Sequence, residues 1–157
     1  MPTGKRGLPK VENASTLVSQ TSVKVRFNEV DSLGIAWHGH YVKYFEDGRE
    51  AFGAEHGLGY LDVYQNGLVT PIVSLTCHYK KPLSYGDSIL VETTFVDSPA
   101  AKIHFTYKIY QKERGELIAE GSTTQVFLEA ESRNLLLSTP VFFEDWKKRV
   151  LPPTGKA

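Results

Sequence analysis

The chain has 157 residues, of which 41% are apolar and 23% charged, proportions that fit one globular domain with a substantial core and exclude a disordered chain. Basic and acidic residues balance at 18 each, which disfavours a general role in binding nucleic acids or a membrane surface. The single cysteine, Cys77, rules out an intramolecular disulfide and suits a reducing compartment, so we expect a cytoplasmic protein.

Both ends of the chain lack the periodicity of a folded segment. Residues 1–20 mix Gly, Pro, Ser and charges without the apolar stretch of a secretory signal, and we interpret them as a flexible leader. Residues 151–157 are interpreted as a flexible tail. No apolar run approaches the roughly 20 residues of a membrane span. The folded domain is therefore expected over residues 21–150.

The first predicted elements are a strand and a long helix. Apolar residues at positions 23, 25 and 27 alternate with polar ones, as in a half-buried strand. After a turn, Tyr41, Phe45, Gly48 and Phe52 recur at steps of four, three and four, which is one apolar face of a helix. Glycines at 53 and 57 mark its expected end, and a further helical turn is expected over residues 60–65.

The rest of the chain predicts strands and one short helix. Strands are expected over residues 71–79, 88–96, 102–109 and 117–128, followed by an amphipathic helix over 140–150. Connections of hairpin size predict mainly antiparallel neighbours among these strands. One curved antiparallel sheet of about five strands must then cover the long aromatic helix, which is an α+β architecture. The edges of that sheet need protection, so pairing with a second copy is expected.

The turn between the first strand and the helix carries the residues best suited to chemistry. Asp31 precedes the helix, and free N–H groups near His38 and Gly39, at the helix start, can hold a negative oxygen. A carboxylate can attack a carbonyl or draw a proton from water. Thioester hydrolysis needs little more, because a thiol with a pKa near that of Cys, about 8.5, leaves without a general acid. The alternative is that Asp31 only satisfies backbone donors before a helix.

Other polar residues near this turn have two interpretations each. The rings of His38 and His40 either act on the substrate or cap the helix. Gly34 is expected at positive φ, and its missing side chain would also let a substrate approach the backbone. Glu46, on the predicted helix, is either a second candidate carboxylate or part of a solvated or inter-subunit face, where Arg49 can pair with it. The remaining histidines lie on separate predicted elements, so we expect no metal site. Lys80, Lys81 and Arg133 are candidates to bind the phosphate groups of a substrate.

Three motifs follow one another in a recognisable order. The first is Asp31-Ser-Leu-Gly34-Ile-Ala-Trp37-His38-Gly-His40-Tyr41. The second is Thr70-Pro71-Ile72-Val73-Ser74, and the third is Tyr79-Lys-Lys-Pro82-Leu83 followed by Gly86-Asp87. Together they span about residues 22–130 and resemble the hotdog-fold acyl-CoA thioesterases, specifically the branch that contains 4-hydroxybenzoyl-CoA thioesterase. His40 is a departure, because members of that family often carry Asn there.

This resemblance implies a hotdog fold and an enzyme that cleaves acyl-CoA to CoA and a free carboxylic acid. It implies Asp31 as general base or nucleophile, with the region of His38 supplying the oxyanion donors. No metal or redox cofactor is then needed. A pocket between two subunits is implied, so the smallest assembly is a homodimer, and a homotetramer is common in the family. The implied substrate-binding residues are Gly34, Trp37, Gly39, Tyr41 and Ser74.

Two other functions fit parts of the sequence. A hotdog dehydratase acting on 3-hydroxyacyl thioesters needs a histidine and an acid, and His38 or His40 with Glu50 would have to fill those roles. A non-catalytic module that binds acyl-CoA is the alternative from another class, although the presence of Asp31 argues against it.

Overall fold

The computed structural model describes residues 17–152. Most of the predicted leader, and the predicted tail from residue 153, lie outside the described residues. The first strand, β1 (Val18–Lys24), begins inside the predicted leader, because residues 18–20 pair with a neighbouring strand. β1 therefore starts three residues before residue 21, where the folded domain was expected to begin.

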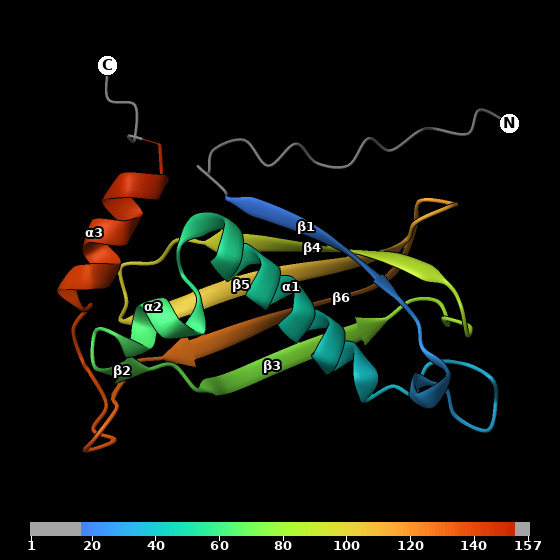
Figure 1. Ribbon diagram of the computed structural model, residues 1–157, viewed down its shortest axis with the longest axis horizontal. Coiled ribbons are helices and arrows are strands. Elements are labelled where there is room, and N and C mark those ends of the chain that lie inside the picture. The colour runs from blue at the N-terminus through green and yellow to red at the C-terminus, as the bar shows by residue number, and fades with distance from the viewer. Residues whose placement is uncertain (1–16, 153–157) are drawn as a thin grey trace, which may run out of the picture.

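Five antiparallel strands form one sheet, as predicted (Figure 1). Their order is β1-β4-β5-β6-β3, which leaves β1 and β3 at the two edges. The other four strands are β3 (Ile72–Tyr79), β4 (Ser88–Val96), β5 (Lys102–Gln111) and β6 (Glu116–Val126).

The expectation that consecutive strands pair is wrong for β3 and β4. β4 pairs with β1, whereas β3 pairs with β6 at the far edge of the sheet. The segment between them therefore crosses the end of the sheet. It is fixed there because Leu83 is fully buried and its carbonyl accepts a hydrogen bond from the N–H of Ala36 (2.7 Å).

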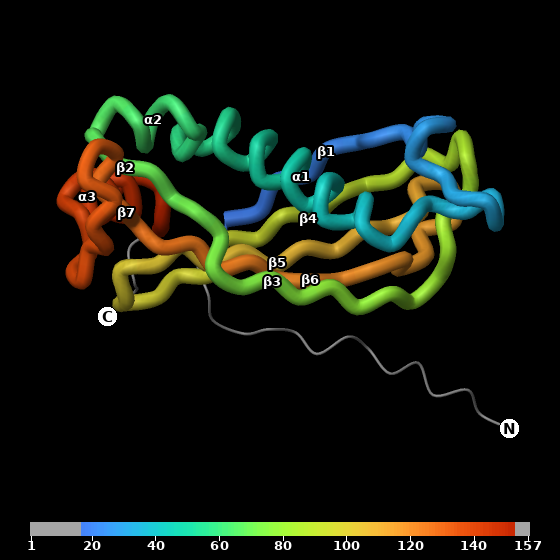
Figure 2. Tube along the Cα trace, turned by 90° about the horizontal axis from the view of Figure 1, so that it is seen from below, coloured from blue at the N-terminus to red at the C-terminus, as the bar shows by residue number. Residues whose placement is uncertain are grey.

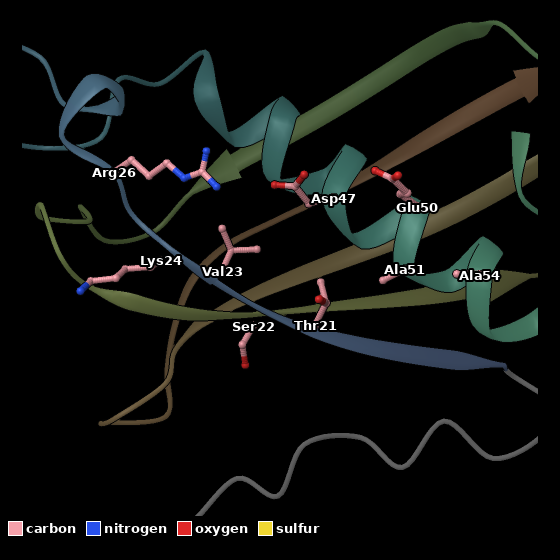
Figure 3. A pocket seen from close by; sticks show the side chains of 9 residues that line it. All are labelled: Thr21, Ser22, Val23, Lys24, Arg26, Asp47, Glu50, Ala51 and Ala54. Carbon is pink, nitrogen blue, oxygen red and sulfur yellow. The ribbon is translucent and has the colours of Figure 1, made fainter.

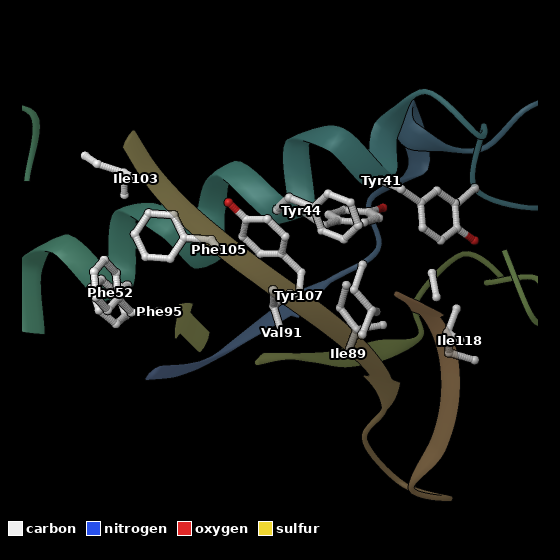
Figure 4. Close-up of a cluster of buried hydrophobic side chains, with 14 of the residues drawn as sticks. Tyr41, Tyr44, Phe52, Ile89, Val91, Phe95, Ile103, Phe105, Tyr107 and Ile118 are labelled. Atoms are coloured by element: carbon white, nitrogen blue, oxygen red, sulfur yellow. The ribbon is translucent and has the colours of Figure 1, made fainter. Parts of the chain in front are cut away.

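The long helix α1 (His40–His56) lies on one face of the sheet, mainly over β1 and β4 (Figure 2). Its buried residues include the predicted face of Tyr41, Phe45, Gly48 and Phe52. Gly48 is needed because a Cβ there would meet the side chains of Thr93 and Val91 of β4. The Phe45 ring stacks on Tyr107 of β5, with 4.5 Å between centroids, and Figure 4 shows other aromatic side chains of this core.

Smaller elements close the end of the sheet where α1 ends (Figure 1). The predicted amphipathic helix is present, and its Trp146 donates a hydrogen bond to the carbonyl of His56 (2.7 Å). The predicted helical turn at residues 60–65 is present, whereas a pair of two-residue strands was not anticipated. These elements are α2 (Tyr60–Tyr64), β2 (Leu68–Val69), β7 (Leu128–Glu129) and α3 (Val141–Val150).

At the other end, the chain leaves the sheet sooner than predicted. β1 stops at Lys24, and residues Phe27–Glu29 form a short 3-10 helix, η1. Phe27 was expected on the buried face of a strand, but 77% of it is exposed and its ring packs edge-on against Tyr85. The early end of β1 matters because the loop that follows η1 holds the candidate catalytic residues, Asp31 and His38.

Candidate active site

A tight loop joins η1 to α1 and places Asp31 at its start. The N–H of Asp31 donates to the carbonyl of Ile35 (2.9 Å), and the N–H of Gly34 donates back to the carbonyl of Asp31 (2.9 Å). Gly34 has φ +77°, the left-handed conformation predicted for it, which favours glycine. Two further backbone bonds, from Ala36 to Leu83 and from Trp37 to Glu29, fix the second half of the loop. The Asp31 carboxylate is therefore carried on a rigid support.

The Asp31 side chain is partly exposed and only half engaged. One carboxylate oxygen, Oδ1, accepts a hydrogen bond from the N–H of Leu33 (2.8 Å). Within residues 17–152 the structure records no partner for the other oxygen. The structural role that the sequence left open is therefore present, and it leaves one oxygen to face a substrate or a water molecule.

Two backbone donors lie free at the start of α1. Gly39 is the residue that precedes the helix, and His40 donates back to the carbonyl of Trp37 (2.9 Å). Among the described residues, no acceptor is recorded for the N–H groups of His38 and Gly39. Free N–H groups at a helix start carry partial positive charge and suit a developing oxyanion.

Aromatic side chains enclose these donors. The Trp37 ring lies directly over Gly39, so that a Cβ at position 39 would clash with it. Tyr79, at the end of β3, packs edge-on against Tyr41 with 4.8 Å between ring centroids, and its hydroxyl donates to the carbonyl of His38 (2.6 Å). Trp37 and Tyr79 remain about half exposed, at 47% and 48%. They offer an apolar surface beside the free amides.

Sequence reasoning missed a buried carboxylate, Glu29, which is only 3% exposed. Its Oε1 accepts hydrogen bonds from the N–H of Arg26 (2.8 Å) and the hydroxyl of Tyr44 (3.2 Å). Its Oε2 lies 3.8 Å from Nζ of Lys43. Burial, with the Glu29 charge as the next cause, raises the pKa of Tyr44 above its ordinary value, so this hydroxyl stays protonated and donates. Glu29 thus ties η1 to α1 on either side of the Asp31 loop.

The other predicted site residues are not all brought together. Side chains alternate along a strand, so Ser74 lies on the opposite face of β3 from Tyr79, and its substrate-binding role stays a prediction. Glu46 is exposed on α1. The two lysines after β3 form ion pairs, Lys80 with Glu120 (3.7 Å) and Lys81 with Glu116 (3.1 Å).

Arg133 follows β7, which pairs with β2 and not with a strand of the five-stranded sheet. His40, the first residue of α1, packs its ring edge-on against Trp37, with 5.5 Å between centroids, and whether it acts on a substrate or caps the helix stays a prediction. In residues 17–152 no group of three or more His, Cys, Asp or Glu residues could hold a metal ion.

A cavity of about 470 Å³ lies away from Asp31, between β1 and α1 (Figure 3). Its walls include Thr21 and Arg26 on one side and Asp47 and Glu50 of α1 on the other. Burial raises the pKa of Asp47, and the carboxylates of Glu29, Glu50 and Glu46 add to the rise, while Lys43 opposes it. Burial and the neighbouring carboxylates therefore disfavour the charged form of Asp47, the form it takes at neutral pH.

Replacing Asp47 by Asn should consequently stabilise the protein at pH 7. A folded-state pKa above the unfolded value means that stability is greatest below the unfolded pKa and falls as pH rises through the folded pKa. The expected gain is about 0.2–0.5 kcal/mol at pH 7, the size of a like-charge helix pair, and it should vanish below about pH 4. Urea unfolding at both pH values measures it.

Asp97→Asn is the matched control with the opposite sign. Asp97 pairs with the buried Lys147 (2.9 Å), so its loss should destabilise the protein at pH 7. A gain for Asp47→Asn that is the same at pH 4 and pH 7 would contradict the electrostatic explanation.

Comparisons with known proteins agree with this architecture. The profile of the thioesterase-like superfamily matches residues 25–154. The Bacillus subtilis (strain 168) protein named "Putative acyl-CoA thioesterase YneP" is 34% identical over 115 residues, which are 73% of this chain and 83% of that protein. A solved DHNA-CoA thioesterase from Staphylococcus aureus superposes with a TM-score of 0.76 and 27% identity, over 83% of this chain and 87% of that one.

A 1,4-dihydroxy-2-naphthoyl-CoA thioesterase from Synechocystis shares the fold, with a TM-score of 0.73 at 19% identity over 82% of this chain and 94% of that one. A five-stranded sheet against one long helix, in this topology, defines the hotdog class of proteins. The chain belongs to the thioesterase-like superfamily, and the predicted identification as a hotdog thioesterase is confirmed. The branch that contains 4-hydroxybenzoyl-CoA thioesterase stays a prediction.

None of the helices in the described part of the chain is long and apolar enough to cross a membrane. The cytoplasmic location stays a prediction from cysteine usage.

Proposed function

We propose that this protein hydrolyses acyl-CoA thioesters to CoA and a free carboxylic acid at the Asp31 loop. The observation that carries the proposal is the pair of N–H groups at the start of α1, of His38 and Gly39, for which no acceptor is recorded within residues 17–152. A partly exposed carboxylate with one unengaged oxygen lies in the same loop. The names of the Bacillus and Staphylococcus relatives, which are thioesterases of CoA esters, support the same reaction.

The proposed reaction assigns each group one task. In the general-base route, Asp31 takes a proton from water while the water oxygen attacks the thioester carbonyl. The oxyanion that forms accepts hydrogen bonds from the free N–H groups, and its collapse breaks the C–S bond. The CoA thiol, with a pKa of about 8.5, leaves as thiolate. In the nucleophilic route, Asp31 itself attacks, and water then hydrolyses the resulting anhydride. No cofactor enters either route.

A second copy of the chain is proposed to complete the site. The free edge strand β3 is exposed along its length, with Ile72 at 38%, Val73 at 58% and Leu75 at 37%. An apolar edge strand invites pairing with another strand. Tyr79 ends the same strand and contacts His38, so a partner on β3 would sit next to the free amides. A homodimer, or a homotetramer built from it, is the expected assembly.

The positions of the candidate dehydratase residues do not support that alternative. Its candidate pairs were His38 or His40 with Glu50. Glu50 lies ten residues after His40 on α1, which separates the two by about 15 Å along the helix axis, and His38 lies before the start of that helix. Glu50 also faces the cavity beside β1 rather than the Asp31 loop (Figure 3). Neither pair is therefore assembled within one chain.

The test is thiol release from a panel of acyl-CoA esters with short, long, branched and aromatic acyl groups, followed with a thiol reagent. Release from at least one ester is the expected result. An α,β-unsaturated absorbance from a 3-hydroxyacyl-CoA, without free thiol, would support the dehydratase instead. A thermal shift with CoA and no turnover of any ester would support the binding module.

A further inference from the structure

The hydroxyl of Tyr79 joins two segments that are far apart in the sequence. It lies at the end of β3 and donates to the carbonyl oxygen of His38, 41 residues earlier, at 2.6 Å. Tyr79 also packs its ring against Tyr41 in the first turn of α1. The hydrogen bond therefore ties the loop that precedes α1 to the edge of the sheet.

This hydrogen bond fixes the direction in which the N–H of Gly39 points. In a planar trans peptide unit the C=O and the N–H point in opposite directions. The carbonyl of His38 and the N–H of Gly39 belong to the same unit, so holding the oxygen from one side aims the N–H to the other. The preceding unit is held in the same manner, since the carbonyl of Trp37 accepts from His40 and thereby aims the N–H of His38.

The two restraints differ in origin. The hydrogen bond from the N–H of His40 to the carbonyl of Trp37 is local, since the residues are three apart, and it forms whenever the turn forms. The bond to His38 depends on the fold, because its donor belongs to a strand at the edge of the sheet. We propose that Tyr79 is a positioning residue, whose hydroxyl orients the Gly39 N–H toward the oxyanion of the thioester reaction. This inference rests on the proposed function.

Two other features support this role. The Trp37 ring fills the space above Gly39. The peptide unit between His38 and Gly39 is therefore held by the indole ring of Trp37 and by the hydrogen bond from Tyr79. Burial, with the nearby thiol of Cys77 as the next cause, raises the pKa of Tyr79 to about 12. The hydroxyl therefore keeps its proton throughout the neutral range and remains a donor.

Tyr79→Phe tests the proposal, because it removes the hydroxyl and keeps the ring that packs against Tyr41. We expect kcat to fall about 10- to 100-fold, less than the roughly 100- to 1,000-fold loss of a whole oxyanion donor. KM should stay unchanged, since the interaction acts in the transition state. Tyr110→Phe is the matched control, because no partner of the Tyr110 hydroxyl is recorded in residues 17–152, and it should retain wild-type kcat.

A second measurement does not depend on turnover. In ¹H–¹⁵N spectra the Gly39 amide should shift clearly in Tyr79→Phe and stay in place in Tyr110→Phe. Wild-type kcat in Tyr79→Phe, or an unmoved Gly39 amide, overturns the positioning role and leaves the proposed function intact. If the wild type releases no thiol from any ester, the proposed function fails, and the Gly39 amide alone decides whether Tyr79 orients that group.

Discussion

Asp31→Asn should lower kcat/KM for the best acyl-CoA substrate by at least about 100-fold, the lower limit for losing a general base. The amide oxygen of Asn can still accept the N–H of Leu33, which now bonds Asp31 Oδ1 at 2.8 Å. The loop should therefore keep its shape, and the loss should report chemistry alone. Thiol release measured beside the wild type, with thermal unfolding of both proteins, checks this.

Asp87→Asn is a matched control. Its carboxylate also accepts a backbone N–H within a turn, from Ser84 at 2.8 Å, but it belongs to the turn before β4. This variant should retain full activity. If Asp31→Asn is as active as the wild type, Asp31 has only its structural role, and Glu46 becomes the next candidate. Incorporation of labelled oxygen into Asp31 during a single turnover in labelled water separates the nucleophilic route from the general-base route.

Local patterns predicted the parts of this fold that local forces determine. The face of Tyr41, Phe45 and Phe52 follows from helical periodicity, and the left-handed Gly34 follows from the need for a tight turn before α1. The alternative that Asp31 satisfies a backbone donor before the helix is confirmed, because the N–H of Leu33, two residues away, donates to its carboxylate, whereas its catalytic role stays a prediction. Interactions between residues a few positions apart can therefore be predicted from the sequence.

Contacts between residues far apart in the sequence could not be predicted from local patterns. Glu29 looks like an ordinary surface carboxylate in a polar stretch, and only its contact with Tyr44, 15 residues later, explains its burial. The tie from Tyr79 to His38 spans 41 residues. The crossing between β3 and β4 likewise depends on where Leu83 is buried, and hairpin-sized spacing alone pointed to the wrong neighbours. The contacts that hold the candidate site in place, those of Glu29 and Tyr79, are therefore tertiary. The groups proposed to react lie close together in the sequence.

Glu29→Ala tests how much the site depends on one such support. It would leave the buried hydroxyl of Tyr44 and the N–H of Arg26, whose hydrogen bond is part-buried, without an acceptor. An unsatisfied buried donor costs roughly 1–3 kcal/mol and the part-buried one less, so a loss of about 2–3 kcal/mol in the free energy of unfolding is expected. The Lys43 pair adds little, because Lys43 is half exposed and 3.8 Å away. Urea unfolding measures the loss.

Glu29→Gln separates the hydrogen bonds from the charge. Its amide oxygen can still accept from Arg26 and Tyr44, so a loss of only about 1 kcal/mol is expected. Glu113→Ala, in the exposed turn between β5 and β6, should stay within about 0.5 kcal/mol of the wild type. Since the Glu29 carbonyl also accepts the N–H of Trp37 (2.9 Å), displacing η1 should disturb the free amides, and activity should fall further in Glu29→Ala than in Glu29→Gln. Wild-type stability of both Glu29 variants would show that this carboxylate does not hold η1 to α1.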